Sequence, residues 1–160
     1  MRKHDVLLIV GKGETWREDM EKMKALNVPH DVMGINCAAM WINPCPMHGF
    51  SYHPETMDRV KAQCPSTITH SLRPSKGVDH YYRLQGEKGG SSSYLACRIA
   101  LEILEYSRIV LAGVPLSGQY FIDYAQQWIN GRNRIMGHVK SFSGATYALL
   151  GPPTKEWLCA

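Results

Sequence analysis

The sequence has no long hydrophobic run, and its apolar stretches are short segments of the kind that form buried strands. None approaches the roughly 20 residues that a helix needs to cross a bilayer. Arg2 and Lys3 precede the apolar run 6–10, but this run is too short for the core of a signal peptide. We therefore expect no membrane partner and a cytoplasmic location.

The chain also lacks paired cysteine motifs, because none of its five cysteines belongs to a CxxC sequence. We expect most of them to be reduced, with Cys97 facing the core. Cys37, Cys45 and His48 lie in one segment, but Cys45-x-x-His48 has no second ligand pair of the kind that zinc sites use. No acidic pair suited to a metal stands out. We therefore predict no metal site.

Charge of one sign is only mildly in excess, with a formal net charge of +4. The basic residues are scattered, and Arg132, Arg134 and Lys140 form their densest group. A protein that binds duplex nucleic acid usually presents a broader basic face. The charge pattern favours a small phosphate-bearing ligand over nucleic acid as the partner, and it leaves a homo-oligomer open.

The length and the order of apolar segments predict one α/β domain over 1–160. The chain has 160 residues, of which 44% are hydrophobic and 20% charged, which is ordinary for a globular protein with a substantial core. Strand and helix patterns alternate, which favours a mostly parallel central sheet covered by helices. The predicted strands are 5–10, 31–35, 48–52, 66–70 and 108–112, and the predicted helices are 15–26, 54–63, 92–104, 120–130 and 143–150.

Two further local expectations follow from this pattern. Thr15 is placed to cap the helix 15–26, whose inner face would carry Met20, Met23 and Leu26. Residues 71–90 are rich in glycine and proline, so we predict a mobile loop there that could close over a ligand.

The first glycine turn, Gly11-Lys12-Gly13, follows directly on the apolar run 6–10. It matches neither the P-loop spacing nor the full dinucleotide-binding pattern of three glycines. One interpretation is a tight turn that requires positive φ at one or both glycines. The functional interpretation is that Lys12 and the backbone around Gly13 contact a phosphate.

The second glycine turn, Gly90-Ser91-Ser92, opens the helix 92–104. The free N–H groups at the start of a helix attract phosphate, whereas a single serine could simply cap the helix. Three consecutive serines, 91–93, favour a ligand-binding role. The sequence contains no Gly-x-Ser-x-Gly elbow, which disfavours a serine nucleophile.

Polar side chains also follow the second and third predicted strands. Asn36 would lie where parallel strands end, which is the edge at which α/β sheets bind ligands, and its amide could read a base or ribose or cap its own turn. Ser51 and His53 follow the third strand. His53 could transfer a proton, or it could cap the next helix or pack beneath a loop. The aromatic residues Trp41, Tyr81, Tyr82, Tyr120 and Trp128 could stack on a base, although most are expected in the core.

The order of these motifs resembles a known superfamily of Rossmann-like proteins. It includes the bacterial CMP-sialic acid-dependent sialyltransferases and the 6-hydroxymethylpterin diphosphokinase-like proteins, and the chain is most similar to small Rossmann-like proteins of tailed phages. The resemblance covers about residues 5–158. It rests on Gly11-x-Gly13, Asn36, Ser51-x-His53-Pro54-Glu55, Gly90-Ser91-Ser92, Tyr94–Cys97, Ile109–Val114, Ser141–Gly144, Leu149–Gly151 and Glu156–Leu158.

This resemblance implies a single three-layer Rossmann-like domain with a nucleotide at the glycine turns. The residues that would surround the nucleotide are Gly11, Gly13, Asn36, Gly90, Ser91 and Ser92. The first turn of the family continues Gly-Pro-Ser, where this chain has Gly13-Glu14-Thr15. The chain also lacks the lid region that carries the catalytic residues of the sialyltransferases, so glycosyl transfer is not carried over.

We therefore predict a protein, phage-encoded and acting in the host cytoplasm, that binds a nucleotide or a nucleotide derivative through its phosphates. Two alternatives stay open at this point. The first is a transferase or hydrolase acting on a nucleotide or nucleotide-sugar, with His53 as the residue that moves a proton. The second is a non-catalytic assembly protein whose glycine turns only shape the chain. The sequence identifies no cofactor.

Overall fold

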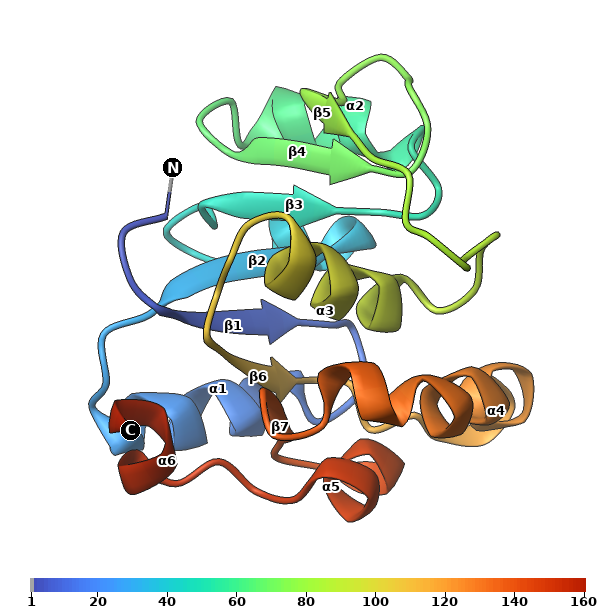
Figure 1. Cartoon of the computed structure of the whole chain (residues 1–160). Helices are drawn as coiled ribbons and strands as arrows, with labels where there is room; N and C mark the ends of the chain where they lie inside the picture. The colour runs from blue at the N-terminus through green and yellow to red at the C-terminus, as the bar shows by residue number, and fades with distance from the viewer. Residues whose placement is uncertain (1) are drawn as a thin grey trace.

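In the computed structural model, which describes residues 2–160, all strands belong to one sheet with every pairing parallel (Figure 1). The strand order is β5-β4-β3-β2-β1-β6-β7. The chain thus builds the sheet outwards from β1 in one direction and returns to continue it in the other. The strands are β1 (Val6–Val10), β2 (Asp31–Ile35), β3 (His48–Phe50), β4 (Ile68–Ser71), β5 (His80–Tyr81), β6 (Arg108–Ala112) and β7 (Val139–Ser141).

Helices cover both faces of this sheet and complete a three-layer Rossmann-like fold. One face packs against α3, α4 and α5, whose apolar side chains share a core with Leu7 and Ile9 of β1. The other face packs against α1 and α6 through Val6, Leu8 and Val10, with the 3₁₀ helix η1 and α2 beside them. The helices are α1 (Trp16–Leu26), η1 (Asn36–Met40), α2 (Thr56–Gln63), α3 (Ser92–Glu102), α4 (Gly118–Ile135), α5 (Gly144–Leu150) and α6 (Lys155–Cys159).

The predicted α/β fold is confirmed, and each predicted strand and helix is present with ends shifted by a few residues. The sheet is more regular than predicted, because its pairings are parallel throughout the described chain. Four short elements were not predicted: β5, β7, α6 and the 3₁₀ helix η1. β5 and β7 have only two and three residues, too few for the alternating pattern that reveals a strand. Within residues 2–160, no helix is long and apolar enough to cross a membrane.

Helix α1 confirms one local prediction and corrects another. Met23 is buried, and Met20 and Leu26 pack against the same core, as expected for its inner face. Thr15, however, makes no side-chain cap. Its hydroxyl donates instead to the carboxylate of Asp19 at 2.8 Å, because that acceptor lies one helical turn away and is completely buried.

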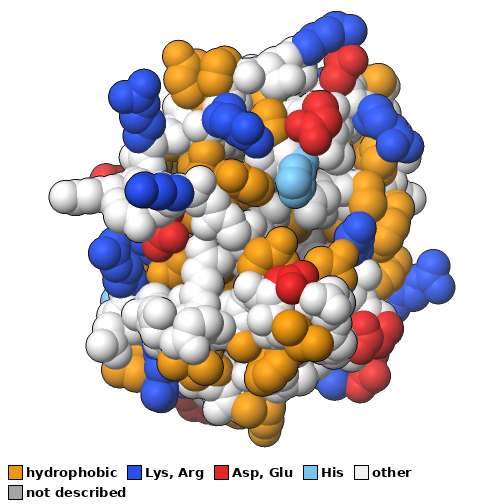
Figure 2. All heavy atoms as spheres, turned by 90° about the vertical axis from the view of Figure 1, so that its right-hand side faces the viewer, with side chains coloured by type: hydrophobic (Ala, Val, Ile, Leu, Met, Phe, Trp, Pro, Cys, Tyr) orange, Lys and Arg blue, Asp and Glu red, His pale blue; other side chains and the backbone are white. Residues whose placement is uncertain are grey.

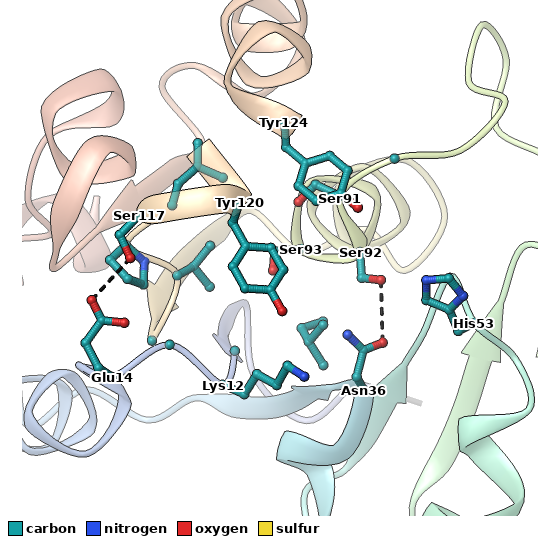
Figure 3. Close-up of a pocket in the computed structure, with 18 residues that line it drawn as sticks. Lys12, Glu14, Asn36, His53, Ser91, Ser92, Ser93, Ser117, Tyr120 and Tyr124 are labelled. Atoms are coloured by element: carbon teal, nitrogen blue, oxygen red, sulfur yellow. Dashed lines mark hydrogen bonds between the residues drawn. The ribbon is translucent and has the colours of Figure 1, made fainter. Parts of the chain in front are cut away.

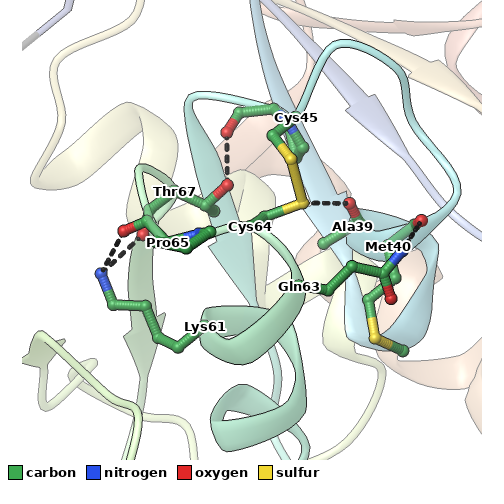
Figure 4. Close-up of a disulfide and its surroundings, with 9 residues drawn as sticks. Ala39, Met40, Cys45, Lys61, Gln63, Cys64, Pro65 and Thr67 are labelled. Carbon is green, nitrogen blue, oxygen red and sulfur yellow. Dashed lines mark hydrogen bonds between the residues drawn. A yellow bond between two sulfur atoms is a disulfide. The ribbon is translucent and has the colours of Figure 1, made fainter.

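A disulfide joins Cys45 to Cys64, with a Cα–Cα separation of 5.7 Å (Figure 4). It connects the segment before β3 to the end of α2, and Thr67 supports the same segment by donating to the Pro46 carbonyl at 2.7 Å. This pairing corrects the expectation for these two cysteines, whereas Cys97 is free and buried as predicted. Cys45 is thereby also removed from the Cys/His set considered for a metal.

Beneath the face covered by α3, a chain of hydrogen bonds crosses the sheet. The Tyr106 hydroxyl donates to Asp31 at 2.9 Å, so its oxygen accepts from His48 Nε2 at 3.0 Å. His48 Nδ1 then accepts from His70 Nε2 at 3.0 Å, and His70 Nδ1 accepts from the Tyr82 hydroxyl at 3.0 Å. Neutral imidazoles use every ring nitrogen in this chain of hydrogen bonds, so neither ring needs a second proton to complete it.

Burial reinforces this neutral state. Desolvation lowers the pKa of His48 to about 4, and desolvation together with repulsion from His48 and His80 lowers the pKa of His70 to about 3. Burial alone would raise the pKa of Asp31, but hydrogen bonds from Lys3, Tyr106 and His4 lower it below its usual value. The carboxylate of Asp31, at one end of this series of hydrogen bonds, therefore stays ionised.

We predict that stability falls as the pH is lowered from about 6.5 towards 4. Below pH 6.5 both histidines are protonated in the unfolded chain but stay neutral in the folded chain. Each therefore lowers the free energy of unfolding by about 1.4 kcal/mol per pH unit in this window. Denaturant unfolding at pH 7, 6 and 5 measures the slope. His70→Gln should flatten it, whereas the exposed-site control His138→Gln should not. Equal slopes in wild type and His70→Gln would contradict the account.

Candidate functional site

A cleft of about 510 Å³ lies at the carboxyl ends of β1, β2 and β6, between the starts of α3 and α4 (Figure 3). In an α/β sheet this is the position where the strand order reverses and ligands bind. Figure 2 looks onto this edge of the sheet, and basic side chains lie mostly around its margin. The cleft is lined by Gly11–Glu14, Ile35, Asn36, His53, Gly90–Ser93, Gly113–Ser117, Tyr120 and Tyr124.

The first glycine turn forms part of the floor of the cleft by close contact with the end of β6. A Cβ at Gly11 would lie 2.5 Å from the Gly113 carbonyl oxygen, and one at Gly13 would lie 2.4 Å from Pro115. Neither Gly11 nor Gly13 has a positive φ, so the interpretation as a turn that needs left-handed backbone is wrong. These positions require glycine because another loop lies against them.

The two glycines donate their N–H groups within the protein. The Gly11 N–H donates to the Ala112 carbonyl at 2.8 Å, and the Gly13 N–H donates to the Gly113 carbonyl at 2.9 Å. These two N–H groups are therefore occupied, and the role left to the glycines is to let Lys12 and the neighbouring backbone reach the cleft.

A buried carboxylate fixes the loops that form this floor. Asp19 Oδ2 accepts from the Gly113 N–H at 3.0 Å, from the Ser143 hydroxyl at 2.7 Å and from Thr15 at 2.8 Å. It thus connects α1 to the loop after β6 and to the start of α5. Gly113 itself has φ +63° and its Cβ would lie 2.4 Å from Trp16. Asp19 was not among the predicted site residues, although its spacing of four residues from Met23 places it on the inner face of α1.

Asn36 lies at the end of β2 with its amide oriented by two serines. Ser51 Oγ accepts the His53 N–H at 2.9 Å, which leaves its own proton to donate to Asn36 Oδ1 at 2.6 Å. Ser92 Oγ lies 3.5 Å from the same oxygen. With Oδ1 engaged as an acceptor, the NH₂ group of Asn36 faces the cleft as a donor (Figure 3). Asn36 does not cap its own turn.

The start of α3 presents unused donors to the cleft. Ser91 is the N-cap, because its Oγ accepts from the Tyr94 N–H at 3.4 Å and from Trp128 Nε1 at 3.3 Å. The N–H groups of Ser92 and Ser93 have no acceptor among residues 2–160. Ser93, which was not among the predicted site residues, adds a hydroxyl that lines the same wall. Ser91 therefore caps the helix, the Ser92 hydroxyl lies beside Asn36, and Ser93 lines the cleft.

The segment before α3 is held by a buried ion pair and a glutamine. Arg98 is buried and lies 3.0 Å from Glu87, and Gln127 donates to the Gly89 carbonyl at 3.0 Å and accepts from the Ser91 N–H at 2.8 Å. Gly90 has φ +122°, and a Cβ there would lie 2.3 Å from Gln127. Residues 71–88 contribute no side chain to the cleft, so this loop does not lie over it here, and its mobility stays a prediction.

Besides two tyrosines, three ionisable side chains line the cleft among the described residues: Lys12, Glu14 and His53. Lys12 is in no ion pair within residues 2–160, and it points along the cleft towards Asn36 (Figure 3). Glu14 lies at the opposite end, where it accepts from the Ser117 hydroxyl at 3.2 Å. His53 is exposed at the Asn36 end, with Nδ1 3.8 Å from Glu55. It neither caps α2 nor packs beneath a loop.

Tyr120 and Tyr124 of α4 form an aromatic side of the cleft. Their rings are nearly parallel, with an interplanar angle of 21° and centroids 6.4 Å apart, and Tyr120 is 56% exposed. Of the aromatic residues considered for stacking, Tyr120 lines the cleft, whereas Trp128 is completely buried in the core. Tyr124 was not predicted, because it lies inside a helix whose buried face also carries aromatic residues.

The structure thus brings most of the predicted site residues into one cleft. Ser51 is the exception, since it is buried behind Asn36 and supports it without lining the cleft. Sequence reasoning missed the loop after β6, because its contribution follows from the pairing of β1 with β6, which no local motif records. The predicted residues that line the cleft are Gly11, Lys12, Gly13, Asn36, His53, Gly90, Ser91 and Ser92.

No family model matches the chain, and no curated protein matches it in sequence. Among solved structures, it is similar to a protein from Lactobacillus plantarum, with a TM-score of 0.52 and 16% identity over 86% of this chain and 59% of that one. It also matches thiamine pyrophosphokinase from Bacillus subtilis, with a TM-score of 0.49, 15% identity and the same coverage. The chain spans 59% of the length of each. At 16% identity, the likeness to the first shows the fold alone.

We predict that Gly13→Ala destabilises the protein by about 2–4 kcal/mol, because its Cβ would overlap Pro115 and the Gly113 carbonyl in a packed floor. Gly49→Ala in β3 is the matched control. Its Cβ would meet its nearest neighbour at an ordinary 3.4 Å, so we expect a change within about 1 kcal/mol. Denaturant unfolding measures both variants. Equal effects would contradict the close approach of the two loops.

Proposed function

We propose that the protein binds a nucleotide or a nucleotide derivative in this cleft, with a phosphate at the Asn36 end. The observation that carries the proposal is the convergence of donors there: the free N–H groups of Ser92 and Ser93, the NH₂ group of Asn36 and the ammonium group of Lys12. Helix N-termini and nearby cations attract phosphate groups. These donors have no acceptor among residues 2–160, so an anion would supply the missing hydrogen-bond acceptor.

The aromatic side of the cleft supports a nucleoside as the rest of the ligand. Tyr120 lies between the donor end and Glu14 (Figure 3), and its exposed ring offers a stacking surface. A volume of about 510 Å³ is within the range of small-molecule sites. Phosphate alone would leave this surface unused, whereas a base would cover it.

A second candidate function is transfer or hydrolysis at that phosphate. His53 lies at the donor end of the cleft, and a histidine there could take up or supply a proton. The donors of Lys12 and Ser92 would stabilise negative charge that develops on the phosphate. His53→Ala tests this candidate: loss of turnover with retained binding supports an enzyme, and the absence of any turnover by the wild type across nucleotides and nucleotide-sugars rejects it.

The proposal extends to the setting of the protein. On the motif resemblance we place it among phage-encoded proteins that act in the host cytoplasm, with a small molecule and not nucleic acid as the partner. Because disulfides are rare in reducing compartments, the oxidation state of Cys45 and Cys64 in the cell tests that location. Helix α4 also exposes the apolar side chains of Tyr120, Phe121 and Ile122, which could pack against a second copy of the chain. Sedimentation measures whether a homo-oligomer forms.

We predict that Ser92→Pro weakens nucleotide binding by about tenfold to a hundredfold relative to Ser92→Ala, as expected for a charge-assisted hydrogen bond. Both variants lose the hydroxyl, but only proline loses the N–H. Proline is tolerated at this first helical position, and Ser91 has the extended backbone that precedes proline, with ψ 117°.

The measurement is calorimetric titration with nucleoside monophosphates and diphosphates, after a thermal-shift screen has identified those that bind. A ligand at a hundredfold excess over its Kd stabilises the folded chain by about 2.7 kcal/mol, which a melting curve detects. Lys155→Ala, an exposed change on α6 away from the cleft, serves as the control. Equal affinities of the Ser92→Pro and Ser92→Ala variants would remove the α3 N-terminus from the site.

A further inference from the structure

The polar groups of the cleft are arranged asymmetrically along its length. The donors described above gather at the Asn36 end, whereas Glu14 is the one carboxylate among its described lining residues. Figure 3 shows Glu14 and Ser117 at the end opposite Asn36 and His53, with Tyr120 between them. A ligand that filled the cleft would therefore meet donors at one end and an acceptor at the other.

Glu14 is held in this position by Ser117. The Ser117 hydroxyl donates to Glu14 Oε1 at 3.2 Å, although Ser117 is the N-cap residue of α4 and could have capped that helix. Glu14 makes no ion pair within the described chain. Ser117 is its one hydrogen-bond donor among residues 2–160, so the remaining lone pairs of this carboxylate can accept from a ligand.

We propose that Glu14 is a specificity-determining residue that accepts a hydrogen bond from the exocyclic amino group of the ligand's base. The proposal rests on nucleotide binding in the cleft, with the phosphate at the Asn36 end and the base beside Tyr120. An amino group then donates to Glu14, whereas a base without it leaves the carboxylate unpaired. The preferred ligands are phosphates of nucleosides with an amino-substituted base.

The strength of this selection follows from the exposure of the site. A buried acceptor can discriminate against a ligand that lacks its donor by several orders of magnitude. Glu14 is exposed, so water can replace a missing donor and the penalty is smaller. We expect about tenfold discrimination, the size of one charge-assisted hydrogen bond at a wet site.

The test compares nucleotides that differ only in the amino group. Adenosine monophosphate is paired with purine riboside monophosphate, and cytidine monophosphate with its analogue that carries hydrogen at the same position. Calorimetry gives the affinity ratio of each pair for the wild type and Glu14→Ala, with Glu18→Ala as the control. Glu18 lies on the exposed face of α1 and pairs with Lys22 at 2.8 Å.

Removing the Glu14 charge should raise the affinity of every phosphate alike, so the ratio within a pair is the readout. We expect a ratio of about ten for at least one pair in the wild type and in Glu18→Ala, falling to near one in Glu14→Ala. A ratio near one in the wild type, or an unchanged ratio in Glu14→Ala, overturns the role of Glu14 while nucleotide binding stands. If no nucleotide binds the wild type, the proposed function itself is rejected.

Discussion

The carboxylate of Asp19 is completely buried, and three segments distant in the sequence depend on it. It accepts hydrogen bonds from Thr15 before α1, from the Gly113 N–H after β6 and from Ser143 before α5. Loss of such an acceptor would leave buried donors unpaired, at a cost of about 1–3 kcal/mol each. Because the loops that form the cleft floor meet at this carboxylate, the shape of the cleft depends on it.

The close approach of these loops explains where the cleft lies. β1 is the interior strand at which the order of strand addition reverses, with β2 on one side and β6 on the other. Glycines at 11 and 13 let the turn after β1 lie directly against the loop after β6. The starts of α3 and α4 then form the walls, and the donors of Ser92 and Ser93 face a space that the glycines leave open.

The sequence was sufficient to predict the fold and much of the cleft, because both depend on local patterns. Apolar runs of strand length identified β1 and β6, and Asn36 was placed correctly by the rule that parallel strands end at one edge. The roles of Asp19, Glu14 and Ser51 depend on partners up to 124 residues away, which no spacing records. The alternative interpretation of the first turn, positive φ at its two glycines, was wrong, because the neighbours that require glycine there are visible only in the folded chain.

The central claim is that this cleft binds the phosphate of a nucleotide through the free N–H groups of α3. An amide-resolved NMR titration with a nucleoside monophosphate tests it most directly, because each N–H reports its own hydrogen bond. The account predicts the largest shifts at the amides of Ser92 and Ser93 and at the Asn36 side chain, with smaller ones near Lys12 and Ser117. Saturating shifts that cluster elsewhere, or none at these positions, would contradict it.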